Sequence, residues 1–199
     1  MSCNACFRDS QLSRAAVEFP QPRFVAPNYW KTNPRTLVVI SAPGSGVGRL
    51  DQADERLRKL LRAYADGTGS LDEIFQHQKT DFGNWTGGKF HRFFFEQLGL
   101  SADEIAFLNI AWCATAENKY PDWMLSNCWE RYTRDLISCL HPQRVLLSGS
   151  AATKFREKII ETCPDLESGG VIQTLHYAHR KGLQIEANEI CRVRNMLYQ

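Results

Sequence analysis

Short apolar runs alternate with amphipathic stretches along most of this 199-residue sequence, and the alternation restricts the folds that it can adopt. Runs of strand length predict four buried strands: Leu37–Ile40, 105–113, the opening of 144–160 and the opening of 171–182. Apolar residues at helical spacing predict helices in 54–67, 87–100, 128–142 and the later part of 144–160. Strands that alternate with helices favour a parallel sheet, so we expect a layered α/β domain.

The length suits one compact domain over residues 1–199, with residues 1–36 as an N-terminal extension. Four prolines between Phe7 and Arg35 indicate that this extension runs over the surface with little regular structure. No apolar run reaches the roughly 20 residues that cross a bilayer, and the polar start Met1–Ser10 is unlike a signal peptide. We expect a cytoplasmic monomer with no membrane partner.

Polar segments follow the carboxyl ends of the expected strands. They are the loop after Ile40, the strand end at Asn109 and the loop that holds His176. Ligands of parallel α/β sheets bind beyond the carboxyl ends of the strands, where such segments meet. The pattern predicts a binding pocket at this edge and leaves its reaction open.

Seven cysteines are many for a chain that we expect in a reducing compartment, where disulfides rarely persist. Cys3 and Cys6 form a C-x2-C pair, and Cys113 and Cys128 are separated by 14 residues. Metal binding and plain burial are the two explanations for these thiols. Four thiolates suit a zinc ion and an iron–sulfur cluster alike.

Five motifs follow one another along the chain. They are "CNAC" at 3–6, "VVISAPG" at 38–44, "LNIAWC" with "NKYP" at 108–121, "PQRVLLSGSAA" at 142–152, and "LHYAHRKG" at 175–182. In this order they resemble the motifs of families four and five, the iron–sulfur members of the uracil-DNA glycosylase superfamily. The resemblance implies a three-layer α/β/α fold with a central parallel four-stranded sheet. It also implies a monofunctional DNA glycosylase, which flips a base out of DNA, hydrolyses its N-glycosidic bond and leaves an abasic site.

The resemblance implies a base-binding group on three segments. The amide of Asn109 would read the edge of the flipped base, since an amide both donates and accepts hydrogen bonds. Phe82, or the nearby Trp85, would stack on the base, with a place in the core as the equal alternative for each ring. Ala42 would line the pocket, and Ser41 before it would belong to the catalytic group. The alternative for Asn109 is a bond to its own backbone turn.

The same resemblance assigns the catalytic hydrogen bond to His176. Its imidazole would donate to the base oxygen that gains negative charge, a contribution on the order of 3 kcal/mol, with His179 as competitor. Asn84 stands beside the position where family five carries its water-activating carboxylate. Asp51 and Asp81 are the alternative sources of negative charge, and a solvated helix start is the plain explanation of Asp51.

The formal net charge of +2 is only weakly basic, so contact with DNA would rest on local patches. Backbone amides of a glycine-rich loop and basic residues after the last strand would approach phosphates. The residues expected to contact DNA are Gly44, Ser45, Gly46, His179, Arg180 and Lys181.

By the resemblance, Cys3, Cys6, Cys113 and Cys128 would hold a [4Fe–4S] cluster that fastens the N-terminal extension to the core. Zinc is the alternative occupant of the four thiolates.

Uracil is the substrate that the resemblance implies by default. Ser41 stands where family four has an acidic or polar residue, and Tyr177 and Ala178 stand where the last motif has proline and serine. These departures also fit a second hypothesis, a bulky modified cytosine of phage DNA, which would make the protein a defence enzyme. A catalytically inactive DNA-binding module and an unrelated metal-bound α/β protein are the alternatives from other classes.

Overall fold

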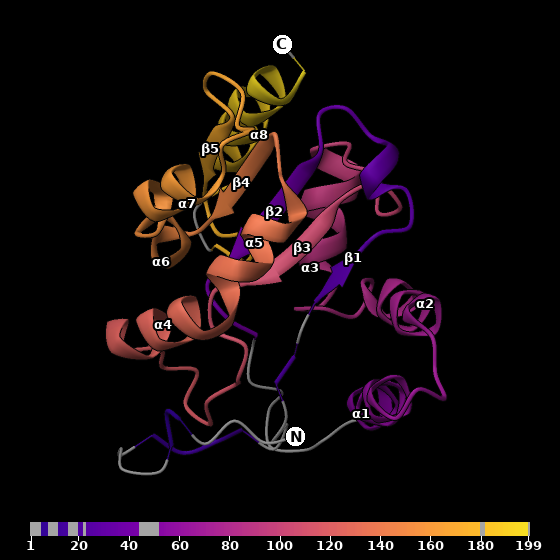
Figure 1. Ribbon diagram of the computed structural model, residues 1–199. Helices are drawn as coiled ribbons and strands as arrows, with labels where there is room; N and C mark the ends of the chain where they lie inside the picture. The colour runs from indigo at the N-terminus through magenta and orange to yellow at the C-terminus, as the bar shows by residue number, and fades with distance from the viewer. Residues whose placement is uncertain are drawn as a thin grey trace.

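The computed structural model describes residues 5–7, 12–15, 20–21, 23–43, 52–179 and 182–198. These residues form a mixed α/β fold in which helices surround a β-sheet (Figure 1). The α/β class predicted from the alternating pattern is confirmed. Within these ranges, no helix has the length and apolar composition needed to span a membrane.

The sheet has five strands in the spatial order β1-β3-β2-β4-β5. They are β1 (Phe24–Val25), β2 (Thr36–Ile40), β3 (Ala106–Asn109), β4 (Arg144–Ser148) and β5 (Val171–Thr174). Strands β2 to β5 run parallel, whereas β1 pairs antiparallel with β3 at the edge. The expected count of four strands is wrong, because the two residues of β1 pair with distant residues of β3 and are too few to show a strand period.

The helices lie between successive strands, apart from the last one, which follows β5. The 3-10 turn η1 (Tyr29–Lys31) precedes β2, and α1 (Gln52–Ala65), α2 (Leu71–Asp81), α3 (Lys89–His91) and the π-helical η2 (Arg92–Gln97) follow it. After β3 come α4 (Asp122–Cys128), the π-helical η3 (Trp129–Thr133) and α5 (Arg134–Leu140). The remaining helices are α6 (Ser150–Thr153), α7 (Arg156–Thr162) and α8 (Leu183–Leu197).

Successive strand residues face two different apolar clusters, because side chains alternate across a strand. Leu37 and Val39 of β2 pack in one cluster with residues of α4, η3, α5 and α7. Val38 and Ile40 pack in the other, with residues of α2, α3, η2 and α8. Figure 1 shows α4 to α7 on one side of the strands and α2 on the other. Helices therefore cover both faces of the sheet.

Local signals explain two helix boundaries. Ser70 caps α2 by accepting a hydrogen bond from the Glu73 amide (3.2 Å), and the Glu73 carboxylate accepts one from the Ser70 amide (3.2 Å). Gly99, with a φ of +74°, lies just past η2 and ends the helix expected in 87–100. The helix expected over 128–142 begins earlier, at Asp122, and passes through the π-helical turn η3.

Candidate functional site

A row of residues at the carboxyl ends of the parallel strands forms the floor of the candidate site. In the sheet register, Asn109 lies beside Ile40, Ile40 beside Ser148, and Ser148 beside Thr174. All four continue the strand positions that face the cluster containing α2, α3 and α8. Three of the four are polar and yet buried. Of this row, Asn109 is the residue that the sequence predicts at the ligand-binding edge of the sheet, and the binding pocket expected there stays a prediction.

Asn109 is the most unusual member of this row. Its side chain is 1% exposed, and neither Oδ1 nor Nδ2 has a hydrogen-bond partner among the described residues. An unpaired buried amide costs about 1–3 kcal/mol, a cost that a bound polar ligand would remove. The backbone here is held by Thr133 of η3, whose hydroxyl donates to the Ile110 carbonyl (2.9 Å). Because neither polar atom of the Asn109 side chain has a described partner, the alternative in which this side chain bonds its own turn is not observed.

His176 lies in the loop that follows β5, two residues after Thr174. Its Nδ1 accepts a hydrogen bond from the Ala178 amide (3.1 Å), so a neutral ring carries its proton on Nε2. Burial lowers the pKa of His176 from its ordinary value, and the nearby His179 lowers it further. The imidazole is therefore neutral near pH 7, with Nε2–H as its hydrogen-bond donor.

Asn109 and His176 lie at the same edge of the sheet. Strands β2 and β4 separate β3 from β5, which at about 4.8 Å per strand puts the two outer backbones about 14 Å apart. Ser148, at the end of β4, is hydrogen-bonded to the loop after β5. Its hydroxyl donates to the Leu175 carbonyl (3.1 Å) and accepts from the Tyr177 amide (3.3 Å). The strand ends thus form one hydrogen-bonded edge.

Aromatic side chains line the same face, but Phe82 is not at its surface. The Phe82 ring is 1% exposed and packs against the rings of Phe24, Trp85, Phe90 and Phe95. The prediction of Phe82 as a stacking plate is corrected to a core position, since the observed packing leaves its ring no free face.

Trp85 is half-buried beside this aromatic core. Its indole N–H donates to Asp81 Oδ2 (3.0 Å), and its ring lies 4.7 Å from the Arg23 guanidinium. That cation also lies 5.9 Å from the ring of Phe107, two residues before Asn109. Arg23 therefore brings positive charge to this face of the sheet, a contribution that the sequence did not reveal.

The described carboxylate nearest to Trp85 along the chain is already engaged. Asp81 accepts from the Asn84 amide through Oδ1 (2.8 Å) and from Trp85 through Oδ2. The exposed Asn84 is thereby bonded to Asp81, the other residue considered for water activation. Asp51, the remaining alternative, lies outside the described residues.

The loop after β2 runs beside the strand end at Asn109. The Ser41 carbonyl accepts from the Ala111 amide (2.9 Å), and the half-buried Ala42 packs against the apolar cluster around α4 and α5. Tyr120 donates its hydroxyl to the Pro43 carbonyl, and burial raises the pKa of Tyr120 to about 12, which keeps that donor protonated. Gly44, Ser45 and Gly46, expected to contact DNA, lie outside the described residues.

Of the expected DNA-contacting residues after β5, the structure describes His179. Its amide donates to the His176 carbonyl (2.8 Å), and its Nε2 lies 3.9 Å from a Glu186 oxygen in α8. Arg180 and Lys181 fall in an interval that the structure does not describe. The role of this segment in DNA binding stays a prediction.

Three of the four cysteines expected to hold a metal group lie in the apolar core around α4 and α5. Cys6, Cys113 and Cys128 are each 5% exposed or less, and the Asn127 amide lies 3.9 Å from the Cys6 sulfur. Burial fits a metal-bound thiolate and an unliganded core thiol alike. Across the described ranges, no three His, Cys, Asp or Glu side chains group as a metal site. Cys3 lies outside those ranges, so the set of four stays a prediction.

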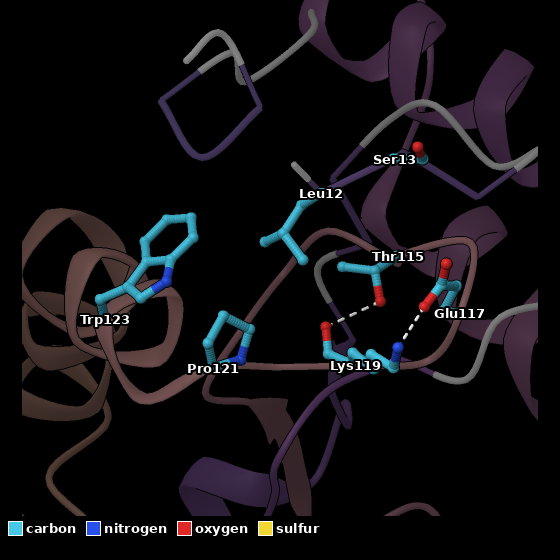
Figure 2. A pocket seen from close by; sticks show the side chains of 7 residues that line it. All are labelled: Leu12, Ser13, Thr115, Glu117, Lys119, Pro121 and Trp123. Atoms are coloured by element: carbon cyan, nitrogen blue, oxygen red, sulfur yellow. Dashed lines mark hydrogen bonds and ion pairs between the residues drawn. The ribbon is translucent and has the colours of Figure 1, made fainter. Parts of the chain in front are cut away.

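Two clefts lie away from the row of strand ends. One, of about 470 Å³, is lined by the N-terminal segment and the loop before α4 (Figure 2). Figure 2 shows Trp123 and Pro121 facing Leu12 across it, with the Lys119–Glu117 ion pair at the far end. The second, of about 670 Å³, lies along α8 and includes Cys191 and Tyr198.

Several residues of the candidate site were given no role from the sequence. They are Arg23, Tyr120, Thr133 and Ser148. Ser148 carried a usable signal, because "RVLLS" ends an apolar run on a polar residue in the same way as "AFLN". The others act through contacts between distant segments, which no local pattern shows. No known family model matches this sequence, and no curated protein matches it either.

Proposed function

We propose that this chain is a DNA glycosylase in which Asn109 and His176 grip one flipped base. The observation that carries the proposal is the buried Asn109 amide, whose two polar atoms have no partner among the described residues. It lies at the carboxyl edge of a parallel sheet, where a ligand would supply the missing hydrogen bonds. The four parallel strands and the helices on both faces suit the three-layer α/β/α arrangement that the proposal implies.

The two side chains divide the chemistry between them. An amide presents a donor beside an acceptor, which matches the ring N–H and carbonyl of a pyrimidine. The Nε2–H of neutral His176 would donate to the base oxygen that gains charge as the glycosidic bond breaks. A neutral donor suits this step because it needs no proton from solvent and leaves the base as a stabilised anion.

The sugar must be attacked by water once the base departs. Asp81 has both carboxylate oxygens engaged by Asn84 and Trp85, which argues for a structural role of this trio. Within the proposal, Asp51 is the carboxylate assigned to orienting the water. The positive charge of Arg23 beside Trp85 would favour an anionic departing base on this face.

A thiolate-bound group has a supporting place in the proposal. Cys6, Cys113 and Cys128, together with Cys3, would hold a [4Fe–4S] cluster, with zinc as the alternative. Such a group would fasten the N-terminal segment to the core and would take no part in bond cleavage.

The experiment is mass spectrometry of bases released from oligonucleotides that carry uracil, cytosine or bulky modified cytosines. We expect release of one such base by the unaltered chain and a loss of about 100-fold or more in Asn109→Ala and His176→Ala. Asn195→Ala, at an exposed position of α8, is the matched control and should keep full activity. Release of uracil alone would discard the modified-cytosine hypothesis.

The same samples test the alternative of an inactive DNA-binding module. That alternative expects DNA affinity that falls steeply with salt, and no released base from any oligonucleotide. This result, obtained with folded protein, would overturn the glycosylase proposal.

A further inference from the structure

Tyr177 connects the loop after β5 to the turn between α2 and α3. Its hydroxyl lies 3.3 Å from the Thr86 hydroxyl, within hydrogen-bond distance. Its ring meets Phe90 edge-on, with centroids 5.5 Å apart, and lies 5.8 Å from Phe94. One residue thus contacts the catalytic loop, the aromatic core and a turn that lies 91 residues away in the sequence.

The imidazole of His176 rests against this tyrosine. The two rings stack with centroids 4.5 Å apart and an interplanar angle of 27°. The Gly149 backbone also closes on the imidazole, since a Cβ at that glycine would lie 3.1 Å from His176 Cδ2. The Tyr177 ring therefore limits the plane in which the imidazole can lie.

Thr86, the partner of Tyr177, has an unusual backbone. Its φ is +53°, and Gly87 and Gly88 follow with φ values of +62° and +79°. A β-branched residue rarely adopts this left-handed region, so surrounding contacts must hold it there. The turn ends at Gly88, where α3 begins.

We propose that Tyr177 is a positioning residue for the His176 imidazole, fixed in turn by the hydroxyl of Thr86. The turn between α2 and α3 and the loop after β5 then act as one unit. The catalytic consequence of this inference rests on the proposed function, whereas the effect on the imidazole itself does not.

The kinetic test uses variants that break the same hydroxyl contact from either side. Tyr177→Phe and Thr86→Val should each lower kcat by about 5-fold, as loss of one neutral hydrogen bond allows, with KM nearly unchanged. The double variant should be no worse than either single variant, because both remove one interaction. Thr86→Ser, which keeps the hydroxyl, should retain wild-type kcat.

Tyr198→Phe is the matched control. Tyr198 also donates its hydroxyl within the chain, to the Leu98 carbonyl (3.0 Å). It lies at the C-terminal end of α8, far from His176 in the sequence. Its loss should change thermal stability and leave kcat unaltered. Multiplicative effects of Tyr177→Phe and Thr86→Val, or an equal loss of kcat in Tyr198→Phe, would overturn the inference.

Nitrogen NMR of the imidazole provides a readout that needs no activity. In the unaltered chain we expect one sharp His176 signal pair with the proton on Nε2. Tyr177→Phe should broaden these signals through motion of the ring, and Thr86→Ser should not. Unchanged spectra in Tyr177→Phe would contradict positioning even if base release is observed. Broadened spectra without base release would instead contradict only the proposed function.

Discussion

Nδ1 of His176 accepts a hydrogen bond within its own loop, which leaves Nε2 as the nitrogen that can bind a ligand. Protonation of Nδ1 would remove the acceptor for the Ala178 amide. Burial and the neighbouring His179, itself 3.9 Å from Glu186, lower the pKa of His176 in the folded state. The unfolded chain regains the ordinary pKa of about 6.5, so unfolding at mildly acidic pH takes up protons.

Folding stability should therefore depend on pH through this residue. The contribution of neutral His176 is fully present above about pH 6.5 and is lost as the pH falls toward the lowered folded-state pKa. We expect the melting temperature of the unaltered chain to fall more between pH 7.5 and pH 5 than that of His176→Gln. Calorimetry at both pH values measures this difference. Parallel pH curves for the unaltered chain and His176→Gln would refute the assignment.

Asn109 and His176 could be predicted as site residues because each comes at or just after the end of an apolar run, a local pattern. Both are found at the same edge of the sheet. Phe82 could not be assigned from the sequence to either the pocket or the core, because the rings that bury this side chain come from Phe24, Phe90 and Phe95 as well as from its neighbour. Burial of one aromatic among eleven phenylalanines depends on tertiary packing that composition does not encode.

At the scale of elements, the backbone just after β4 lies very close to the His176 ring. Gly149 follows Ser148 with a φ of +90° and a ψ of 159°, a region that only glycine adopts readily. Its amide donates to the Thr174 carbonyl of β5 (2.9 Å), which draws the two strand ends together. The glycine therefore leaves room for the His176 ring and ties its loop to β4.

Gly149→Ala should disturb this arrangement directly. The new methyl group would lie 3.1 Å from His176 Cδ2, and the backbone would be strained by about 1–3 kcal/mol. We expect base release to fall at least about 10-fold in protein that remains folded, a loss consistent with misplacement of a catalytic group. Gly170→Ala is the control, because its methyl group would meet the Gln143 carbonyl at 2.7 Å at the opposite end of β5. It should lower stability alone, and equal activity losses in both variants would contradict a specific effect on His176.

The sequence predicted some elements well and missed others for identifiable reasons. Strand β2 was marked by a short apolar run, and the helices predicted in 54–67 and 87–100 were marked by apolar residues at helical spacing. Helix α2 was missed although its Ser70–Glu73 capping box is a local signal. The π-helical turn η3 had no such signal, since it is recognised only by its geometry and by the Thr133 hydroxyl that it brings to the Ile110 carbonyl.

At the scale of the whole molecule, the N-terminal segment lies along the loop that follows β3. Arg14 forms an isolated antiparallel bridge with Thr115, the Ala116 amide donates to the Ser13 carbonyl (2.8 Å), and the Gln21 amide donates to that of Trp112 (2.8 Å). A few backbone hydrogen bonds at a partly exposed seam hold a segment only weakly, because each is worth about 1 kcal/mol net. A metal group joined to Cys6 would add a covalent attachment between the N-terminal segment and the core.

Removal of one proposed ligand should therefore release the segment. In Cys128→Ser purified without oxygen, we expect most of the bound iron, or zinc if that is the occupant, to be lost. Proteases should then cleave within the first 21 residues faster than in the unaltered chain, because the seam alone must hold them. Metal analysis and timed proteolysis measure the two effects. Cys139→Ser, at an exposed position of α5, should change neither. If Cys128→Ser keeps its metal and its protection, Cys128 is a buried thiol of the core, and the N-terminal segment is held by backbone pairing and packing.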